Sequence, residues 1–134
     1  MRIVVDYPPI YTEIAAAFDI SGRNPIFAWG DRVFNPHNIV IGPELIAHEA
    51  VHGRRQGNDV EGWWRRYIDD PAFRLAEEIP AHAAEFNILA GVPGTNRQHK
   101  RKCLAYVAKR LTSPIYGRLI TLDAAKKAIL DEAG

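Results

Sequence analysis

The residues best suited to chemistry in this sequence are His48, Glu49 and His52, which form an HExxH pattern. On a helix, residues four apart lie one turn along and about 40° apart around the axis, so both imidazoles project toward one point. Histidines held in this way can bind a metal ion, and Glu49 lies where it can reach a metal-bound water. The pattern predicts two metal ligands and a general base; the alternative is a helix with two ordinary histidines.

The helix that must position these residues is predicted from residue 43 to residue 56. Gly42 and Pro43 suit an N-cap and a first helical position, and Glu44 complements the positive end of the helix dipole. Two arginines precede Gly57, a residue type that commonly ends helices. These local signals predict a rigid support for the site.

A third metal ligand has to come from elsewhere, and an acidic downstream helix offers one. Glu78, His82 and Glu85 recur at intervals that place them on one helical face, with apolar residues nearby to anchor the helix. Glu78 is the preferred ligand, and His82 can support the site from one turn away. Glu77 points about 100° away and is the main competitor. Glu85 is less favoured, and a solvated surface for all of these acidic residues is the alternative.

The pattern HEAVH, followed downstream by EIPAH, resembles the gluzincin zinc metallopeptidases, and more narrowly their minimal single-domain forms in small bacterial and phage proteins. The resemblance implies that His48, His52 and Glu78 bind zinc. It also implies that Glu49 is the general base. The residue four positions after the third ligand, here His82, would orient a ligand histidine.

One residue departs from the pattern of that family, which usually has aspartate where this sequence has His82. A neutral imidazole can accept or donate one hydrogen bond, but it fixes a ligand histidine less strongly than a carboxylate does. We expect this departure to affect turnover more than metal binding. The resemblance also includes the order strand, helix, small sheet, active-site helix and ligand helix, and so covers about residues 2 to 89.

The expected function is that of a zinc-dependent peptidase acting on an extended polypeptide. Zinc would lower the pKa of its water toward about 7, and Glu49 would take the proton and return it to the leaving amine. Arg74, Tyr67 and Tyr116 are candidate donors to the developing oxyanion. The rival interpretation is a zincin-like scaffold with little or no turnover that acts as a binding or regulatory protein, such as a phage accessory protein. A zinc hydrolase for another bond is the third alternative.

Composition gives the site no obvious partner beyond a peptide or protein substrate. The 134 residues carry 17 basic and 16 acidic side chains, which provides no general argument for nucleic acid or a membrane surface. The basic run at residues 99–102, together with Lys109 and Arg110, is interpreted as a solvated helix face. No apolar run approaches the roughly 20 residues that cross a bilayer. The lone Cys103 and the lack of a signal-peptide pattern at residues 1–10 favour the cytoplasm, and we expect a monomer or weak homo-oligomer.

The predicted fold class is α+β, in one domain spanning residues 1–134. An N-terminal strand and helix precede a small, mostly antiparallel sheet packed on the HExxH helix, and one sheet edge near the metal could take an extended peptide. A helical C-terminal half follows, so that residues 1–90 hold the site and residues 91–134 form a helical extension. Predicted strands are residues 2–5, 26–29, 32–34 and 39–41; predicted helices are residues 9–20, 43–56, a short one after Asp59, 71–89, 96–111 and 122–133.

Pro80 lies inside the predicted ligand helix. Proline removes one backbone hydrogen bond and clashes with the carbonyl four residues earlier. We therefore expect a kink or a break near residues 76–80, beside the candidate ligands.

Overall fold

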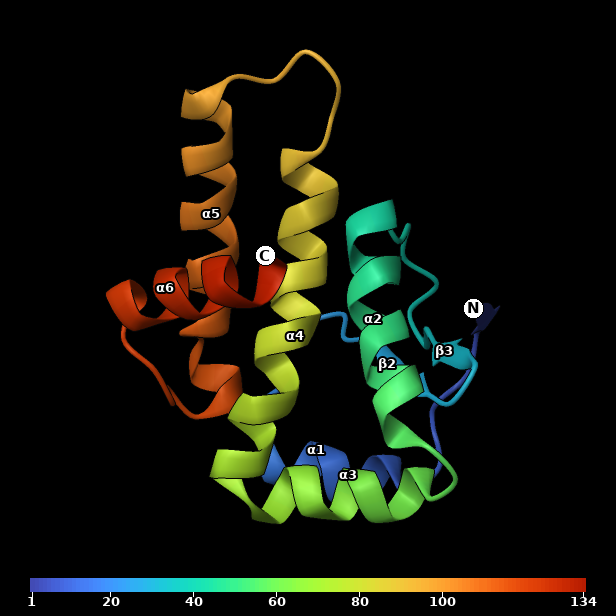
Figure 1. Cartoon of the computed structure of the whole chain (residues 1–134). Coiled ribbons are helices and arrows are strands. Elements are labelled where there is room, and N and C mark those ends of the chain that lie inside the picture. The colour runs from blue at the N-terminus through green and yellow to red at the C-terminus, as the bar shows by residue number, and fades with distance from the viewer.

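Six α-helices, one short 3-10 helix and three short strands form the protein in a computed structural model that describes residues 1–134 (Figure 1). In chain order they are β1 (Arg2–Val4), α1 (Tyr11–Ala17), β2 (Phe27–Trp29), β3 (Arg32–Phe34), α2 (Pro43–Gln56), α3 (Val60–Asp69), α4 (Pro71–Ala90), α5 (Arg97–Leu111), η1 (Pro114–Tyr116) and α6 (Leu122–Ala133). The α+β class, with an N-terminal strand and helix and a helical C-terminal half, is confirmed. Helix α4 lies in the middle, between α2 and the pair α5 and α6, while α1 and α3 close one end.

The sheet is mixed, with β3 in the centre. It pairs in parallel with β1 and antiparallel with β2, so only one of its two pairings is antiparallel. Residues 39–41, predicted as a strand, lie outside the sheet. The reason is local, because the side-chain amide of Asn35 donates to the carbonyl of Ile39 at 2.9 Å and accepts from its N–H at 3.1 Å. These bonds occupy backbone groups that strand pairing would use.

Short polar side chains begin most of the helices. Asp59 caps α3, Asp70 caps α4 and Asn96 caps α5, each by accepting a backbone N–H from the first turn. Helix α2 instead begins with Gly42 at the N-cap and Pro43 in the first position, as predicted. These local signals explain why the predicted and observed bounds of α2 agree.

Pro80 does not break α4, which runs continuously from Pro71 to Ala90. A proline inside a helix costs about 3 kcal/mol, so the surrounding packing must offset this loss. That packing is extensive, because α2, α3, α5 and α6 all contact α4. Of the expected kink or break, the break is therefore wrong, and tertiary contacts outweigh the local signal.

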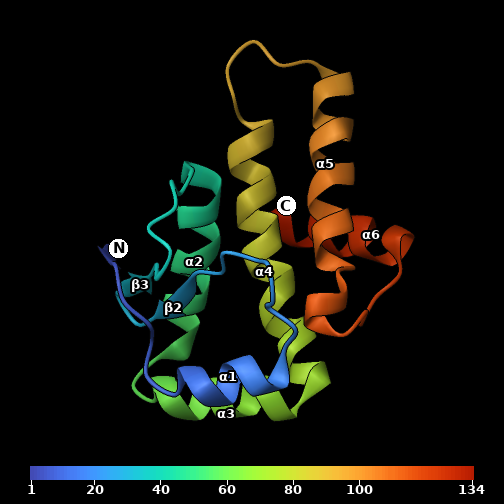
Figure 2. The same ribbon diagram turned by 180° about the vertical axis from the view of Figure 1, so that it is seen from behind.

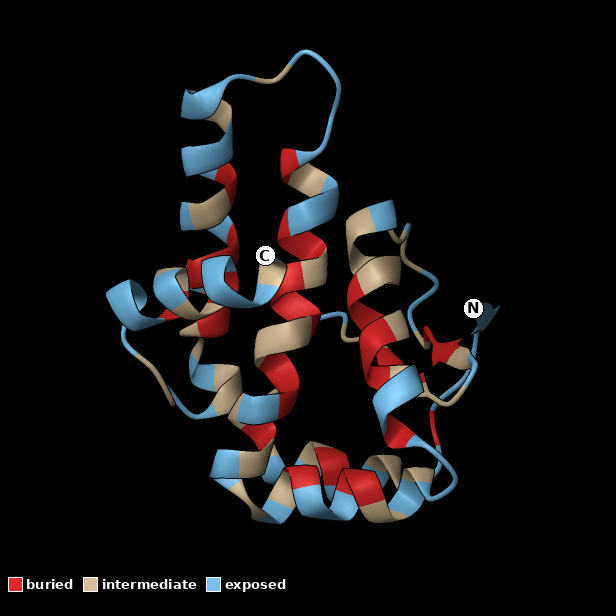
Figure 3. Cartoon of the chain, in the orientation of Figure 1, coloured by how far each residue is buried: buried red, intermediate tan, exposed pale blue.

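Two apolar clusters lie on either side of the α2–α4 contact. One is formed by α4, α5 and α6 and includes Phe86, Val107 and Ile129, while the other joins α1, the sheet and α3 and includes Ile14 and Trp64. Figure 3 shows buried residues along α4 and on the inner faces of α2 and α5. The helices carrying the HExxH pattern and its predicted third ligand are thus fixed from both sides. None of the helices combines the length and apolar character needed to cross a membrane.

The side chain of Gln56 ties the end of α2 to the sheet. It donates to the carbonyl of Ala28 at 2.9 Å and accepts the N–H of Gly30 at 2.7 Å. The indole of Trp64 also donates to the carbonyl of Ala28, at 3.0 Å. The carbonyl of Ala28, on edge strand β2, therefore already accepts two side-chain hydrogen bonds, which leaves it unavailable to an added peptide strand.

We predict that Gln56→Met lowers the free energy of unfolding by about 1 to 3 kcal/mol, because it keeps the side-chain volume but removes both hydrogen bonds. Urea denaturation measures the change. Gln98→Met is the control, since Gln98 is exposed on α5 and should leave stability unchanged. Equal stability of the two variants would contradict this role of Gln56.

Candidate metal centre

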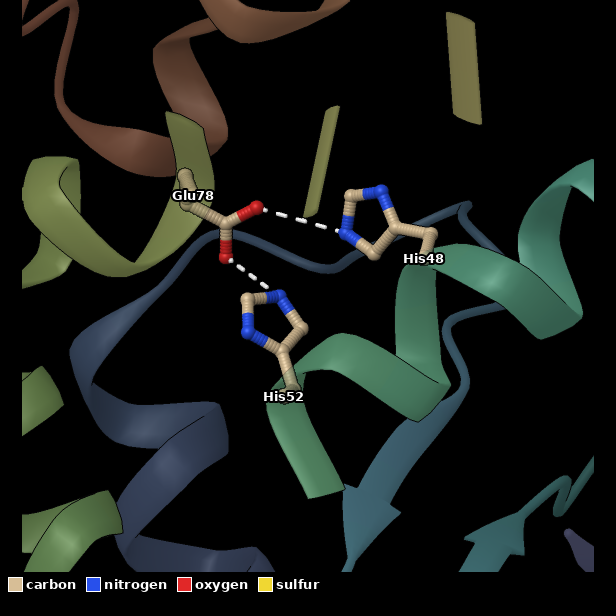
Figure 4. A group of neighbouring side chains, drawn as sticks. All are labelled: His48, His52 and Glu78. Atoms are coloured by element: carbon tan, nitrogen blue, oxygen red, sulfur yellow. Dashed lines mark ion pairs between the residues drawn. The ribbon is translucent and has the colours of Figure 1, made fainter. Parts of the chain in front are cut away.

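Two histidines of α2 and one glutamate of α4 meet where these helices pack together (Figure 4). Nε2 of His48 lies 3.3 Å from Oε1 of Glu78, and Nε2 of His52 lies 3.0 Å from Oε2 of the same carboxylate. Each residue can offer one ligand atom so that all three atoms lie within 4.8 Å of one another. The structure thus brings together the three residues predicted as metal ligands.

The spacing and chemistry of these atoms fit a zinc ion. Tetrahedral zinc with bonds of about 2.0 to 2.2 Å separates neighbouring ligand atoms by about 3.3 to 3.6 Å. Here Nε2 of His48 lies 3.3 Å from one oxygen of Glu78 and Nε2 of His52 lies 3.0 Å from the other, so a zinc ion would need only small side-chain shifts. Oε1 of Glu78 is also buried, and it lies 3.3 Å from Nε2 of His48 without an aligned hydrogen bond, so this oxygen can still accept a cation. His48, His52 and Glu78 could therefore hold a divalent metal.

The carboxylate of Glu78 is held by a hydroxyl as well as by the histidines. Tyr67 of α3 donates its hydroxyl to Oε2 at 2.6 Å. Burial by itself would raise the pKa of Glu78, but the adjacent His52 and His48 lower it well below its usual range. Burial and the charge of Glu78 raise the pKa of Tyr67, which therefore stays protonated as a donor. This contact was not predicted from the sequence.

His48 lies between two carboxylates. Burial would lower its pKa, but Glu78 and Glu85 outweigh this and raise it to about 10. The metal-free site therefore carries a positive charge on this imidazole at neutral pH. A metal ligand has to be deprotonated, so a metal that binds here must displace that proton.

Glu49 lines a cavity of about 230 Å³ next to the candidate ligands. It points into this space from α2 and is 8 % exposed. Burial raises its pKa, while the charges of His48 and His52 act in the opposite direction. A carboxylate with a raised pKa is a better proton acceptor, which suits the predicted general base.

Most of the cavity wall is apolar. Residues of α1 and α3, the segment between α1 and β2, and the turn at η1 contribute to it, among them Phe18, Ile26 and Trp63. Figure 2 shows the segment between α1 and β2 crossing the face of α2 and α4. Apolar walls exclude water and strengthen electrostatic interactions inside the cavity.

Glu77, the main competitor of Glu78, is occupied elsewhere. The indole of Trp63 donates to its Oε1 at 2.6 Å, and Nε of Arg55 donates to its other oxygen. Both oxygens of Glu77 are thus paired with groups other than the two histidines, although the ring of Trp63 itself packs against His52 with 5.4 Å between ring centroids. Glu77 is therefore part of the contact between α4 and its neighbours rather than of the ligand group.

Glu85 contacts His48 from the side opposite Glu78. Its Oε1 lies 3.3 Å from Nδ1 of His48, and Arg110 of α5 donates to both of its oxygens, at 3.0 and 3.1 Å. Burial would raise the pKa of Glu85, but His48 and Arg110 outweigh it and lower the value to about 2. Sequence reasoning missed Arg110, because a basic helix was interpreted as solvated. A second acidic residue, Glu85, on the helical face of Glu78 was the available signal for a buried cation.

His82 is fully buried, but it makes no hydrogen bond to either histidine ligand. Its Nδ1 lies 2.8 Å from the main-chain carbonyl of Glu78, and because a carbonyl only accepts, Nδ1 carries the proton. Its ring instead packs edge-on against His48, with 4.7 Å between ring centroids. Burial and the charge of His48 lower its pKa to about 4, so His82 is neutral.

Of the three candidate oxyanion donors, only Tyr116 remains open to a substrate. The hydroxyl of Tyr67 is bonded to Glu78, and the guanidinium of Arg74 donates to three main-chain carbonyls. Tyr116 lines the cavity, and so does Arg110. The geometry therefore favours Tyr116 over the other two.

The sequence matches no protein-family model, and no curated protein or solved structure is detectably similar to it. The resemblance to gluzincins is therefore carried by the motif residues alone. What the site can do follows from its own geometry and charges.

We predict that Glu78→Gln abolishes uptake of zinc, while Glu77→Gln retains about one zinc per chain, because only Glu78 lies beside the histidines. Zinc measured after gel filtration of metal-loaded protein gives the stoichiometry. Both glutamates are buried on α4, so each variant controls for the loss of a buried charge. Zinc retained by Glu78→Gln would contradict the assignment of the third ligand.

Proposed function

We propose that this protein is a zinc-dependent metallohydrolase, and most specifically a peptidase, with His48, His52 and Glu78 as metal ligands. The observation that carries the proposal is the buried ligand group itself, in which the carboxylate of Glu78 faces Nε2 of His48 with one oxygen and Nε2 of His52 with the other. The cavity lined by Glu49 adds an adjacent place for a substrate. A peptide or protein in the cytoplasm is the proposed substrate.

Two imidazole nitrogens and one carboxylate oxygen are a donor set typical of hydrolytic zinc sites, which keep a further position open. When bound, zinc supplies a Lewis acid that polarises a carbonyl and lowers the pKa of a water to about 7. Harder cations such as magnesium prefer oxygen ligands alone, which argues against them here.

The chain's own residues provide the proton transfers. Glu49 accepts a proton from water and delivers it to the leaving amine, a role that its raised pKa supports. Tyr116 donates its hydroxyl to the developing oxyanion, because its pKa is raised by burial and it stays protonated. The apolar wall limits the access of competing water.

The cavity supports a substrate with an apolar side chain next to the cleaved bond. Its volume of about 230 Å³ can take one side chain rather than a folded segment. Pairing along β2 is not part of the proposal, because the carbonyl of Ala28 is already bonded by Gln56 and Trp64.

A scaffold that binds zinc with little turnover, and acts as a binding or regulatory protein, is the second candidate. The observation that favours it is the burial of the site, since His48, His52 and Glu78 are between 2 and 5 % exposed. Such a protein would bind zinc but cleave no member of a broad peptide library. Zinc-dependent cleavage would exclude it.

Glu49→Gln should keep zinc bound and reduce the rate of peptide cleavage by about 10² to 10⁴-fold, because it removes the proton acceptor but no ligand. The measurement is turnover of a peptide library together with zinc content. Glu44→Gln, on the first turn of the same helix, serves as the control and should retain activity. Cleavage at the wild-type rate by Glu49→Gln would contradict the mechanism.

Tyr116→Phe should lower kcat by about 10² to 10³-fold with zinc content unchanged, because it removes only the hydroxyl. Tyr106→Phe is the matched control, since Tyr106 is exposed on α5. Steady-state kinetics of both variants test the assignment. An unchanged kcat in Tyr116→Phe would remove this residue from the mechanism.

A further inference from the structure

The ring of His48 presents its two nitrogens to two different carboxylates. Nε2 faces Glu78 at 3.3 Å, and Nδ1 faces Glu85 at 3.3 Å. Nδ1 is buried and has no aligned hydrogen-bond partner, so Glu85 is the acceptor within its reach. One nitrogen is thus directed at the candidate metal position and the other at an anion.

Glu85 is fixed in this position by a residue from another helix. Its side chain is fully buried, and Arg110 of α5 donates Nε–H to one oxygen at 3.0 Å and an NH2 group to the other at 3.1 Å. A bidentate pair of this kind fixes the plane of the carboxylate as well as its place. Oε1 of Glu85 retains capacity to accept a further hydrogen bond.

His82, the residue that the resemblance implies for orienting a ligand histidine, makes no hydrogen bond to His48 or His52. Its Nδ1–H is used by the main-chain carbonyl of Glu78. Glu85 lies seven residues after Glu78. Seven residues are about two helical turns with an angular offset of about 20°, so Glu85 projects from the same face as Glu78.

We propose that Glu85, held by Arg110, is the residue that positions His48 for metal binding. This rests on the proposed zinc site, and it extends that site into the C-terminal helices. Ligand histidines commonly donate their second ring N–H to a carboxylate, which fixes the tautomer and makes the other nitrogen a better ligand. Helix α5 then contributes to the metal centre through Arg110, which fixes Glu85 beside His48.

The first test compares the zinc affinity of Glu85→Gln with that of wild type, measured by competition with a chromophoric chelator. We expect affinity to fall by about 10- to 100-fold. Glu77→Gln is the matched control, because Glu77 is also buried on α4 and also paired with an arginine, but faces neither histidine. It should bind zinc as wild type does. Equal zinc affinity of Glu85→Gln and wild type would overturn the proposal.

A second variant separates positioning from structural support. Glu85→Met combined with Arg110→Met replaces the ion pair by apolar groups of similar volume, an exchange that often preserves folding stability. We expect the thermal midpoint of this double variant to lie close to that of wild type, while its zinc affinity stays about 10- to 100-fold weaker. If the double variant recovers zinc affinity together with stability, Glu85 is structural only and the proposal fails.

The outcomes also separate this proposal from the proposed function. Wild type that takes up no zinc overturns both. Wild type that binds one zinc, lost in His48→Ala but unchanged in Glu85→Gln, overturns the positioning role alone and leaves the metal centre intact.

Discussion

The structure depends on the burial of a carboxylate, Glu78, between two imidazoles. Removing an ionised carboxylate from water costs several kcal/mol unless charges and hydrogen bonds compensate for it. Here His48 and His52 of α2 and the hydroxyl of Tyr67 provide that compensation. A shift of α2 relative to α4 would therefore separate the carboxylate of Glu78 from the imidazoles and leave it buried without compensation.

The other elements can be understood as supports of this polar contact. One apolar cluster holds α4 against α5 and α6, and the other holds α3 and the sheet near the ends of α2 and α4. Tyr67 lies on α3 and Arg110 lies on α5, so a helix from each cluster also contributes a polar side chain to the site. The polar centre and the two apolar clusters stabilise one arrangement of the helices.

Capping residues and residue spacing predicted most helices and strands, whereas pairings between residues far apart in the sequence were not predicted. The bounds of α2 and the cap at Asp70 follow from residues adjacent in sequence, and the spacing of His48, His52 and Glu78 selected the group that the fold brings together. The parallel pairing of β1 depends on a distant strand, and the continuity of α4 through a proline depends on tertiary packing. The partners of Tyr67, Glu85 and Arg110 lie on other helices, so no spacing rule could identify them.

The central claim is that His48, His52 and Glu78 bind zinc, and the zinc content of the untagged protein tests it most directly. Mass spectrometry of metals on freshly purified wild type and on His52→Ala is the measurement. About one zinc per chain in wild type, lost in the variant, is the result that our account predicts. Wild type without zinc, which also takes up none when zinc is added, would contradict it.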